Sequence, residues 1–138
     1  MTLERWRDIW LNEGFAEFSS WLWSEHTGQA SAQQFFDRWY AQPAGHGYFW
    51  NPPPADPGGP AHIFAWSEYE RGAMTLQALR VRLGDATFFT IMRGWYQLHR
   101  YGSARVEDFT AYAEQVSGAD LQHFFDVWLY QPGKPANW

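Results

Sequence analysis

Apolar side chains recur at helical spacing along most of this chain. In residues 12–27 the apolar positions lie mostly three or four residues apart, and Gly28 follows. This stripe consists of Phe15, Phe18, Leu22 and Trp23. It predicts an amphipathic helix that stops at the glycine. A second helix is predicted to start at Ser31, because Ser31 and Gln34 have the spacing of a capping box.

The same spacing predicts four further helices. They cover residues 67–84, 85–100, 104–116 and 120–130. Short connections that contain glycine favour neighbouring helices that pack together. No segment alternates apolar and polar residues convincingly, as a half-buried strand would. We therefore predict an all-α fold of about six helices, in a single domain over residues 1–138.

Helical periodicity is lost in residues 43–66, which we interpret as a proline- and glycine-rich loop. Residues 43–62 contain six of the eight prolines of the chain, and proline interrupts helices. The triple proline at residues 52–54 is compatible with a polyproline ligand for an aromatic groove. It is also compatible with a rigid surface loop, which is the interpretation we favour.

Composition adds one unusual feature. The length of 138 residues and the apolar content of 46% suit one folded domain with one core. The chain also has ten tryptophans, and aromatic rings dominate both cores and interfaces. Two interpretations stay open: a Trp-rich core, or several rings that face a partner domain or a substrate groove.

Charge and cysteine content exclude several function classes. The formal net charge of −5 argues against nucleic acid as a partner. Without cysteine there is no disulfide, no Cys-ligated metal and no thiol catalysis, and the redox compartment stays open. No apolar run approaches a membrane segment of about 20 residues, and of the compartments we favour the cytoplasm. The five histidines form no His-x-x-x-His pair, so we expect no zinc site built from them.

A carboxylate stands at the start of the first predicted helix, in the run Trp-Leu-Asn-Glu-Gly-Phe-Ala-Glu-Phe at residues 10–18. A lone Glu in a first helical turn is usually explained by the positive end of the helix dipole. This run, however, resembles the third-ligand segment of the gluzincin zinc aminopeptidases, the family of aminopeptidase N and leukotriene hydrolase. The resemblance implies that Glu13 is a zinc ligand.

The resemblance also implies what the chain lacks. A catalytic zinc takes three protein ligands and keeps one position open for water. In the family, two histidines come from a His-Glu-x-x-His helix, with eighteen residues between the second histidine and the Glu. Counted back from Glu13, both histidines would fall before residue 1. We therefore expect this chain to hold only the C-terminal, helical part of the catalytic domain.

Glu17 lies one helical turn after Glu13 and shares its face. It would orient a metal-bound histidine through a hydrogen bond, or it is an ordinary solvated carboxylate, and both interpretations stay open. Many family members have a Glu seven residues after the ligand, where this chain has Ser20.

A second run, Glu-Tyr-Glu-Arg-Gly-Ala at residues 68–73, resembles the Tyr-x-Lys-Gly segment of the same family, with Arg71 at the Lys position. Without the family, a Tyr that packs locally at a helix start is the simpler interpretation. The resemblance implies that Tyr69 donates a hydrogen bond to the oxyanion of the tetrahedral intermediate. A neutral phenol can make that donation at working pH.

The resemblance thus implies that the intact protein is a zinc metalloaminopeptidase that hydrolyses N-terminal residues from peptides. We expect this chain to be inactive alone and without stoichiometric zinc, because it needs the upstream His-Glu-x-x-His lobe as its partner. Its face around Glu13 and Tyr69 should then be apolar and prone to self-association. Two alternatives are a non-catalytic helical module that binds peptides or proteins, and a split enzyme completed by a separate chain.

Overall fold

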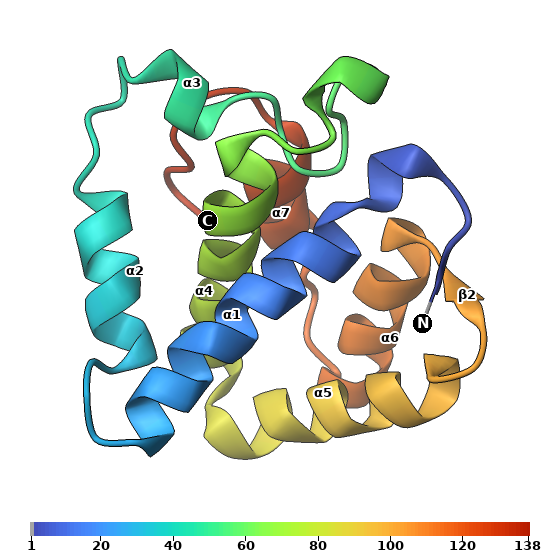
Figure 1. Ribbon diagram of the computed structural model, residues 1–138. Helices are drawn as coiled ribbons and strands as arrows, with labels where there is room; N and C mark the ends of the chain where they lie inside the picture. The colour runs from blue at the N-terminus through green and yellow to red at the C-terminus, as the bar shows by residue number, and fades with distance from the viewer. Residues whose placement is uncertain (1) are drawn as a thin grey trace.

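Helices dominate the computed structural model, which describes residues 2–138 (Figure 1). The α-helices of this part are α1 (Trp10–His26), α2 (Ala32–Tyr40), α3 (Gly47–Trp50), α4 (Gly72–Leu83), α5 (Asp85–His99), α6 (Val106–Ser117) and α7 (Gln122–Phe125). Short 3-10 helices are η1 (Trp6–Asp8) and η2 (Pro60–His62), and π-helical segments are η3 (Ser67–Arg71) and η4 (Asp126–Tyr130). Two short strands, β1 (Thr2–Leu3) and β2 (Ser103–Ala104), pair in parallel. The all-α prediction is confirmed.

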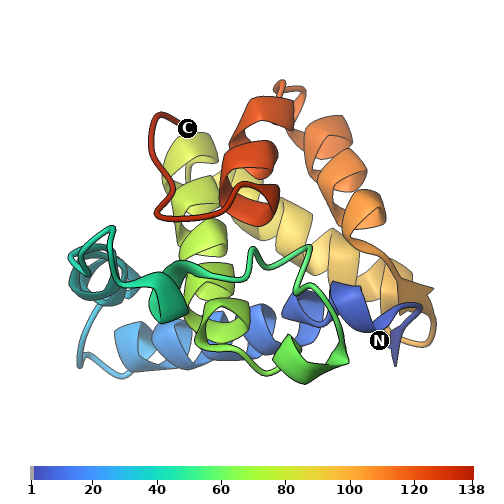
Figure 2. The ribbon, with the colours of Figure 1, turned by 90° about the horizontal axis from the view of Figure 1, so that it is seen from above.

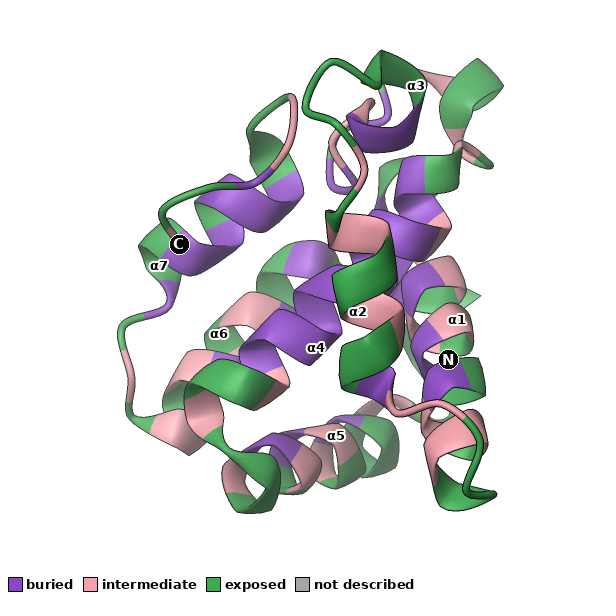
Figure 3. Ribbon diagram, turned by 90° about the vertical axis from the view of Figure 1, so that its left-hand side faces the viewer, coloured by how far each residue is buried: buried purple, intermediate pink, exposed green. Residues whose placement is uncertain are grey.

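Helix α4 lies at the centre of the molecule. Residues 72–79 are all buried, and Figure 3 shows α4 buried over most of its length while the outer faces of α2 and α5 are exposed. Helices α1, α2 and α5 and the segment η4 pack against it. A helix that is covered on every side needs apolar or small residues all round, which explains why this segment lacks a polar face.

The tryptophans divide between the core and the surface. Five of them are at most 2% exposed: Trp10, Trp21, Trp50, Trp95 and Trp128. The buried rings meet other aromatic rings edge to face, as Trp95 and Phe109 do with ring centroids 5.3 Å apart. Trp6, Trp23 and Trp66 are more than half exposed. The Trp-rich core is therefore confirmed for these five rings, and a partner or substrate at the exposed ones stays a prediction.

Most predicted helix boundaries agree with the structure to within about two residues. The capping box is confirmed: the Ser31 hydroxyl accepts from the Gln34 N–H at 3.1 Å, and the Gln34 amide oxygen accepts from the Ser31 N–H at 2.8 Å. The predicted helix over residues 67–84 is observed as η3 followed by α4, and the one over residues 120–130 as α7 followed by η4. Within residues 2–138, no helix has both the length and the apolar character needed to cross a membrane.

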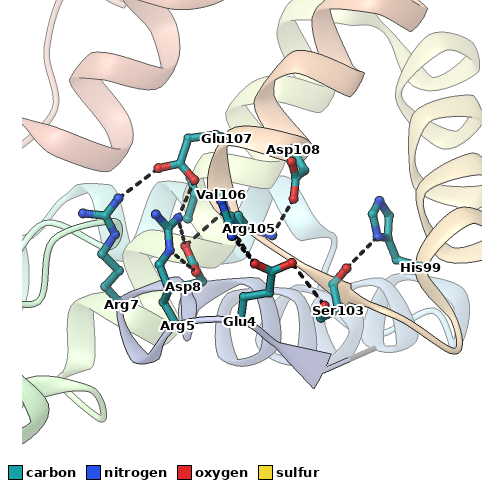
Figure 4. A network of polar contacts seen from close by, with 10 residues as sticks. All are labelled: Glu4, Arg5, Arg7, Asp8, His99, Ser103, Arg105, Val106, Glu107 and Asp108. Carbon is teal, nitrogen blue, oxygen red and sulfur yellow. Dashed lines mark hydrogen bonds and ion pairs between the residues drawn. The ribbon is translucent and has the colours of Figure 1, made fainter.

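The expectation of no strand is wrong at β1 and β2, where Thr2 pairs with Ser103 and Leu3 with Ala104. A polar network fastens the same chain end to α6 (Figure 4). The buried Asp8 carboxylate accepts from the Arg5 guanidinium at 2.8 Å and from the Val106 N–H at 3.2 Å. A contact across about a hundred residues leaves no local pattern in the sequence. The hydrogen bonds of Asp8 fix the segment that leads into α1.

The proline-rich stretch differs from the surface loop that we expected. It contains the one-turn helix α3, and Phe49, Trp50 and Ala55 are at most 5% exposed. The Ala55 N–H donates to the Leu129 carbonyl at 2.9 Å, and the Trp50 indole donates to the Pro43 carbonyl at 2.9 Å. The stretch therefore packs against the C-terminal part of the chain, beside the start of η3 (Figure 2).

Candidate functional site

The two sequence motifs meet where α1 crosses the junction of η3 and α4. A Cβ atom added to Gly14 would lie 2.9 Å from the Cα atom of Gly72 and 3.2 Å from the Glu68 carbonyl oxygen. Only glycine allows two backbones to approach this closely. Since Glu13 precedes one of these glycines and Tyr69 lies one turn before the other, the crossing places the two candidate residues together.

Tyr69 and Glu13 interact directly. Both side chains are partly buried. The pKa of Tyr69 is raised, first by burial and then by the negative charge of Glu13 and a hydrogen bond to it. A phenol keeps its proton at neutral pH even at its ordinary pKa, so Tyr69 is a hydrogen-bond donor there. The structure thus brings together the residues that the sequence singled out as metal ligand and oxyanion donor.

Tyr69 belongs to the π-helix η3 rather than to a regular α-helix. A π-helical turn is rare, and such turns occur frequently at functional sites. Here it joins directly onto α4 at Gly72, the position of the close crossing. The irregular turn therefore coincides with the candidate site.

Two buried carboxyl groups flank Tyr69. Glu68 is fully buried, and neither of its carboxyl oxygens has a hydrogen-bond partner among residues 2–138. Burial raises the pKa of Glu68 to about 9, with a smaller contribution from the charge of Glu13. Burial and the charge of Glu17 raise the pKa of Glu70 to about 8. Both groups are therefore protonated at neutral pH, which sequence patterns do not reveal because Glu is usually exposed.

Glu17 lies on the Glu13 face of α1, close enough to Glu70 to influence its pKa. Its carboxylate accepts a hydrogen bond from the Trp21 indole nitrogen at 2.8 Å. This hydrogen bond gives the Glu17 carboxylate a defined position beside the site. The observed partner is an indole rather than a histidine, so the expected hydrogen bond to a metal-bound histidine stays a prediction.

The donor set contains one part of a zinc site. A carboxylate is an accepted zinc ligand, and Glu13 is accessible beside a hydrogen-bond donor. Over the described range, 2–138, no group of three or more His, Asp or Glu side chains is arranged to hold a metal ion. Glu13 therefore suits zinc as one ligand, and the described residues do not complete a site around it.

Arg71, the fourth residue of the second motif, is fully buried. Its guanidinium donates to five backbone carbonyls, those of Trp128 (2.9 Å), Trp50 (2.7 Å), Gly133 (3.0 Å), Val127 (3.0 Å) and Gln131 (2.6 Å). Burial lowers the pKa of Arg71 to about 10, so the group still carries its charge at neutral pH. The sequence indicated only that Arg71 replaces Lys at this position. It could not indicate these hydrogen bonds, because their acceptors lie 21 to 62 residues away in the sequence.

An aromatic cavity opens one helical turn before Tyr69. Its volume is about 330 Å³, and its lining residues are Trp39, Gln42, His46, Tyr48, Phe49 and Trp66. Trp66 immediately precedes η3, and its ring centroid lies 6.4 Å from that of Trp39. Two of the exposed rings, Tyr48 and Trp66, therefore line a cavity beside the start of η3.

The chain is similar to known proteins over most of its length. The Peptidase family M1 domain matches residues 1–128. Aminopeptidase N of Streptomyces lividans is 29% identical over 150 residues, which cover 96% of this chain and 17% of that protein. Glutamyl aminopeptidase of Bos taurus is 28% identical, over 98% of this chain and 15% of its own length.

Solved structures show the same likeness. The M1 zinc metallopeptidase of Deinococcus radiodurans superposes with a TM-score of 0.80 at 28% identity, over 97% of this chain and 30% of that one. A mutant of that enzyme bound to a Tyr-Ser-Ala substrate gives the same TM-score, over 31% of its length. The chain thus spans about a sixth of these two curated relatives.

Proposed function

The chain belongs to peptidase family M1, and on this basis we propose that it is part of the catalytic domain of a zinc metalloaminopeptidase. In this proposal Glu13 is a zinc ligand and Tyr69 is the oxyanion donor. The observation that carries the proposal is the crossing at Gly14 and Gly72, which brings Glu13 and Tyr69 together although they are 56 residues apart in the sequence. The names of the relatives support peptides as substrates and the N-terminal residue as the one released.

Each residue has a defined task in this mechanism. Zinc, when bound, would polarise the scissile carbonyl and activate a water molecule. Glu13 offers its carboxylate from the first turn of α1, a helix fixed against α4. Tyr69 is a neutral phenol at working pH, so it can donate to the carbonyl oxygen of the substrate as negative charge develops there. Glu17 is proposed to hold a zinc-bound histidine in orientation.

The rest of the machinery would come from an upstream lobe of the same protein, with its two histidines and its general base. One carboxylate does not hold zinc tightly, because affinity depends on the number and geometry of ligands. We therefore propose that residues 1–138 are inactive in isolation.

Two substitutions in the complete zinc-loaded peptidase that contains this chain test the assignment. Tyr69→Phe removes only the phenolic hydroxyl, and we expect kcat to fall by about 10²–10³-fold with zinc content unchanged. Glu13→Gln replaces the anionic ligand by a neutral amide, and we expect less than one zinc per protein and a matching loss of activity. Zinc is measured by atomic absorption and kcat with aminoacyl substrates.

Tyr96→Phe is the matched control, because Tyr96 is 68% exposed on α5 and lies outside the site. The assignment of Tyr69 is wrong if Tyr69→Phe behaves like this control. The assignment of Glu13 is wrong if Glu13→Gln keeps one zinc per protein. One equivalent of zinc, or peptidase activity, in purified residues 1–138 would overturn the proposed inactivity of the isolated chain.

A further inference from the structure

Arg71 places a positive charge in the interior with only neutral acceptors. All five of its hydrogen bonds go to backbone carbonyls, and the side chain is fully buried. Burying a charge costs free energy even when it is hydrogen bonded. A guanidinium is suited to this cluster, because its planar fork has five N–H donors in fixed directions. The arrangement therefore holds several segments in one fixed geometry.

The acceptors belong to two separate parts of the chain. One is Trp50, the last residue of α3. The others lie in residues 127–133, within η4 and just beyond it. Arg71 itself ends η3, the π-helical turn that carries Tyr69. One side chain thus fastens this turn to both the proline-rich stretch and the C-terminal segment.

Tyr69 and Arg71 project in different directions, since residues two apart on a helix do not face each other. Tyr69 interacts with Glu13 of α1, while Arg71 binds the opposite, C-terminal side. Gly72 adds the close contact with Gly14 at the next position. The turn is therefore held from two sides, and catalytic groups need positions fixed to within about 0.5 Å.

We propose that Arg71 is a positioning residue for Tyr69: its five hydrogen bonds hold η3 where the Tyr69 hydroxyl meets both Glu13 and the reacting carbonyl. This inference rests on the proposed role of Tyr69. The family's Tyr-x-Lys-Gly segment has Lys at this position, but three donors at a single point would leave some of the five carbonyls of this chain without a partner. Arg71→Lys therefore keeps the charge and loosens the turn.

A double-mutant cycle in the complete zinc-loaded peptidase tests the inference. We expect Arg71→Lys to lower kcat by about tenfold, because a displacement of about 1 Å at a catalytic group can cost more than that. KM and zinc content should stay within about twofold, since substrate and metal are not contacted by Arg71. In the Tyr69→Phe background, Arg71→Lys should lower kcat by less than about twofold, because the hydroxyl that it positions is already absent.

Asn51→Ala tests the same set of Arg71 hydrogen bonds from the acceptor side. The Asn51 side-chain oxygen accepts from the Gly133 N–H at 2.8 Å and so fixes one of the carbonyls that Arg71 binds. We expect a smaller fall in kcat, about threefold, that also disappears in the Tyr69→Phe background. If Arg71→Lys does not fold, the cycle of Asn51→Ala with Tyr69→Phe tests the positioning role instead.

Arg80→Lys is the matched control. The Arg80 guanidinium also makes several contacts, as ion pairs with Glu25 and Asp85, but it lies on the part of α4 away from Tyr69. Arg80→Lys should therefore leave kcat unchanged. The inference is overturned if Arg71→Lys and Asn51→Ala lower kcat equally with and without the Tyr69 hydroxyl, or if both variants leave kcat unchanged. Tyr69→Phe alone separates the two ideas: full activity in that variant refutes the proposed function, whereas additive effects refute only the positioning role.

Discussion

At the scale of single residues, the site is notable for carboxyl groups in two different states. Glu13 is partly exposed and bonded to Tyr69, while Glu68 and Glu70 are buried with raised pKa values of about 9 and 8. A buried carboxyl avoids the cost of its charge by keeping its proton. Neutral Glu68 therefore contributes packing beside the site without adding a second negative charge next to Glu13.

The pKa of Glu68 predicts how stability changes with pH. Between its ordinary pKa near 4.5 and its folded value of about 9, the folded chain binds a proton that the unfolded chain has released. The free energy of unfolding should therefore fall as pH rises from about 5 to about 8. Glu68→Gln imitates the protonated carboxyl in shape, so we expect this variant to show a weaker fall and to be more stable than the parent at about pH 8.

Urea unfolding of the chain at several pH values measures this effect. Asp56→Asn serves as the control, because Asp56 is exposed in the proline-rich stretch and its replacement should leave the slope unchanged. A parent chain that is equally stable at both ends of the range, or a Glu68→Gln variant with the parental slope, would contradict the prediction.

The functional residues that the sequence predicted stand in local motifs, whereas the one that it did not predict depends on distant contacts. Glu13 and Tyr69 stand in short local motifs whose resemblance to a family can be read directly, and the structure places them in contact. The part played by Arg71 depends on carbonyls contributed by residues 127–133 and by Trp50. A local pattern cannot show which distant carbonyls will surround a side chain.

At the scale of elements, the crossing of α1 with η3 and α4 determines the site. Gly14→Ala should push the two backbones apart, because the new Cβ atom would lie 2.9 Å from the Cα atom of Gly72. We expect a loss of stability of about 1–3 kcal/mol or more, as for other insertions into close packing. The kcat of the complete peptidase should fall as well, since the shift would separate Tyr69 from Glu13.

Gly102→Ala is the control for Gly14→Ala, because a Cβ atom at Gly102 meets nothing within 4 Å. Thermal unfolding and kcat are compared between the two variants. If Gly14→Ala were as stable and as active as Gly102→Ala, the close crossing would not be what brings the motifs together.

The main elements could be predicted from the sequence because helices leave a local, periodic signal. The capping box at Ser31 and the stops near Gly28 and Gly84 are examples of that signal, and they agree with the structure. The pairing of β1 with β2 and the helix α3 could not be predicted in this way. Strand pairing joins distant residues, and α3 is held by the burial of Phe49 and Trp50 in an otherwise irregular stretch.

At the scale of the whole molecule, the aromatic residues are distributed unequally. The core holds the five buried Trp residues, while three of the exposed rings precede η3: Tyr48 (90% exposed), Phe64 (64%) and Trp66 (61%). Large exposed apolar patches mark interaction sites. Because this patch adjoins Tyr69, we infer that it faces substrate or the upstream lobe in the intact protein.

The same patch predicts self-association of the isolated chain. Burying Phe64 and Trp66 between two copies would remove apolar surface from water, which is favourable by about 25 cal/mol per Å². We expect a concentration-dependent increase in mass in sedimentation equilibrium, and Phe64→Ser with Trp66→Ser should shift it toward the monomer. Tyr101→Ser is the control, because Tyr101 is 91% exposed near β2, outside this patch. A parent chain that stays monomeric up to about millimolar concentration would show that the patch is too small to bind another copy, since stable interfaces need about 1,000 Å².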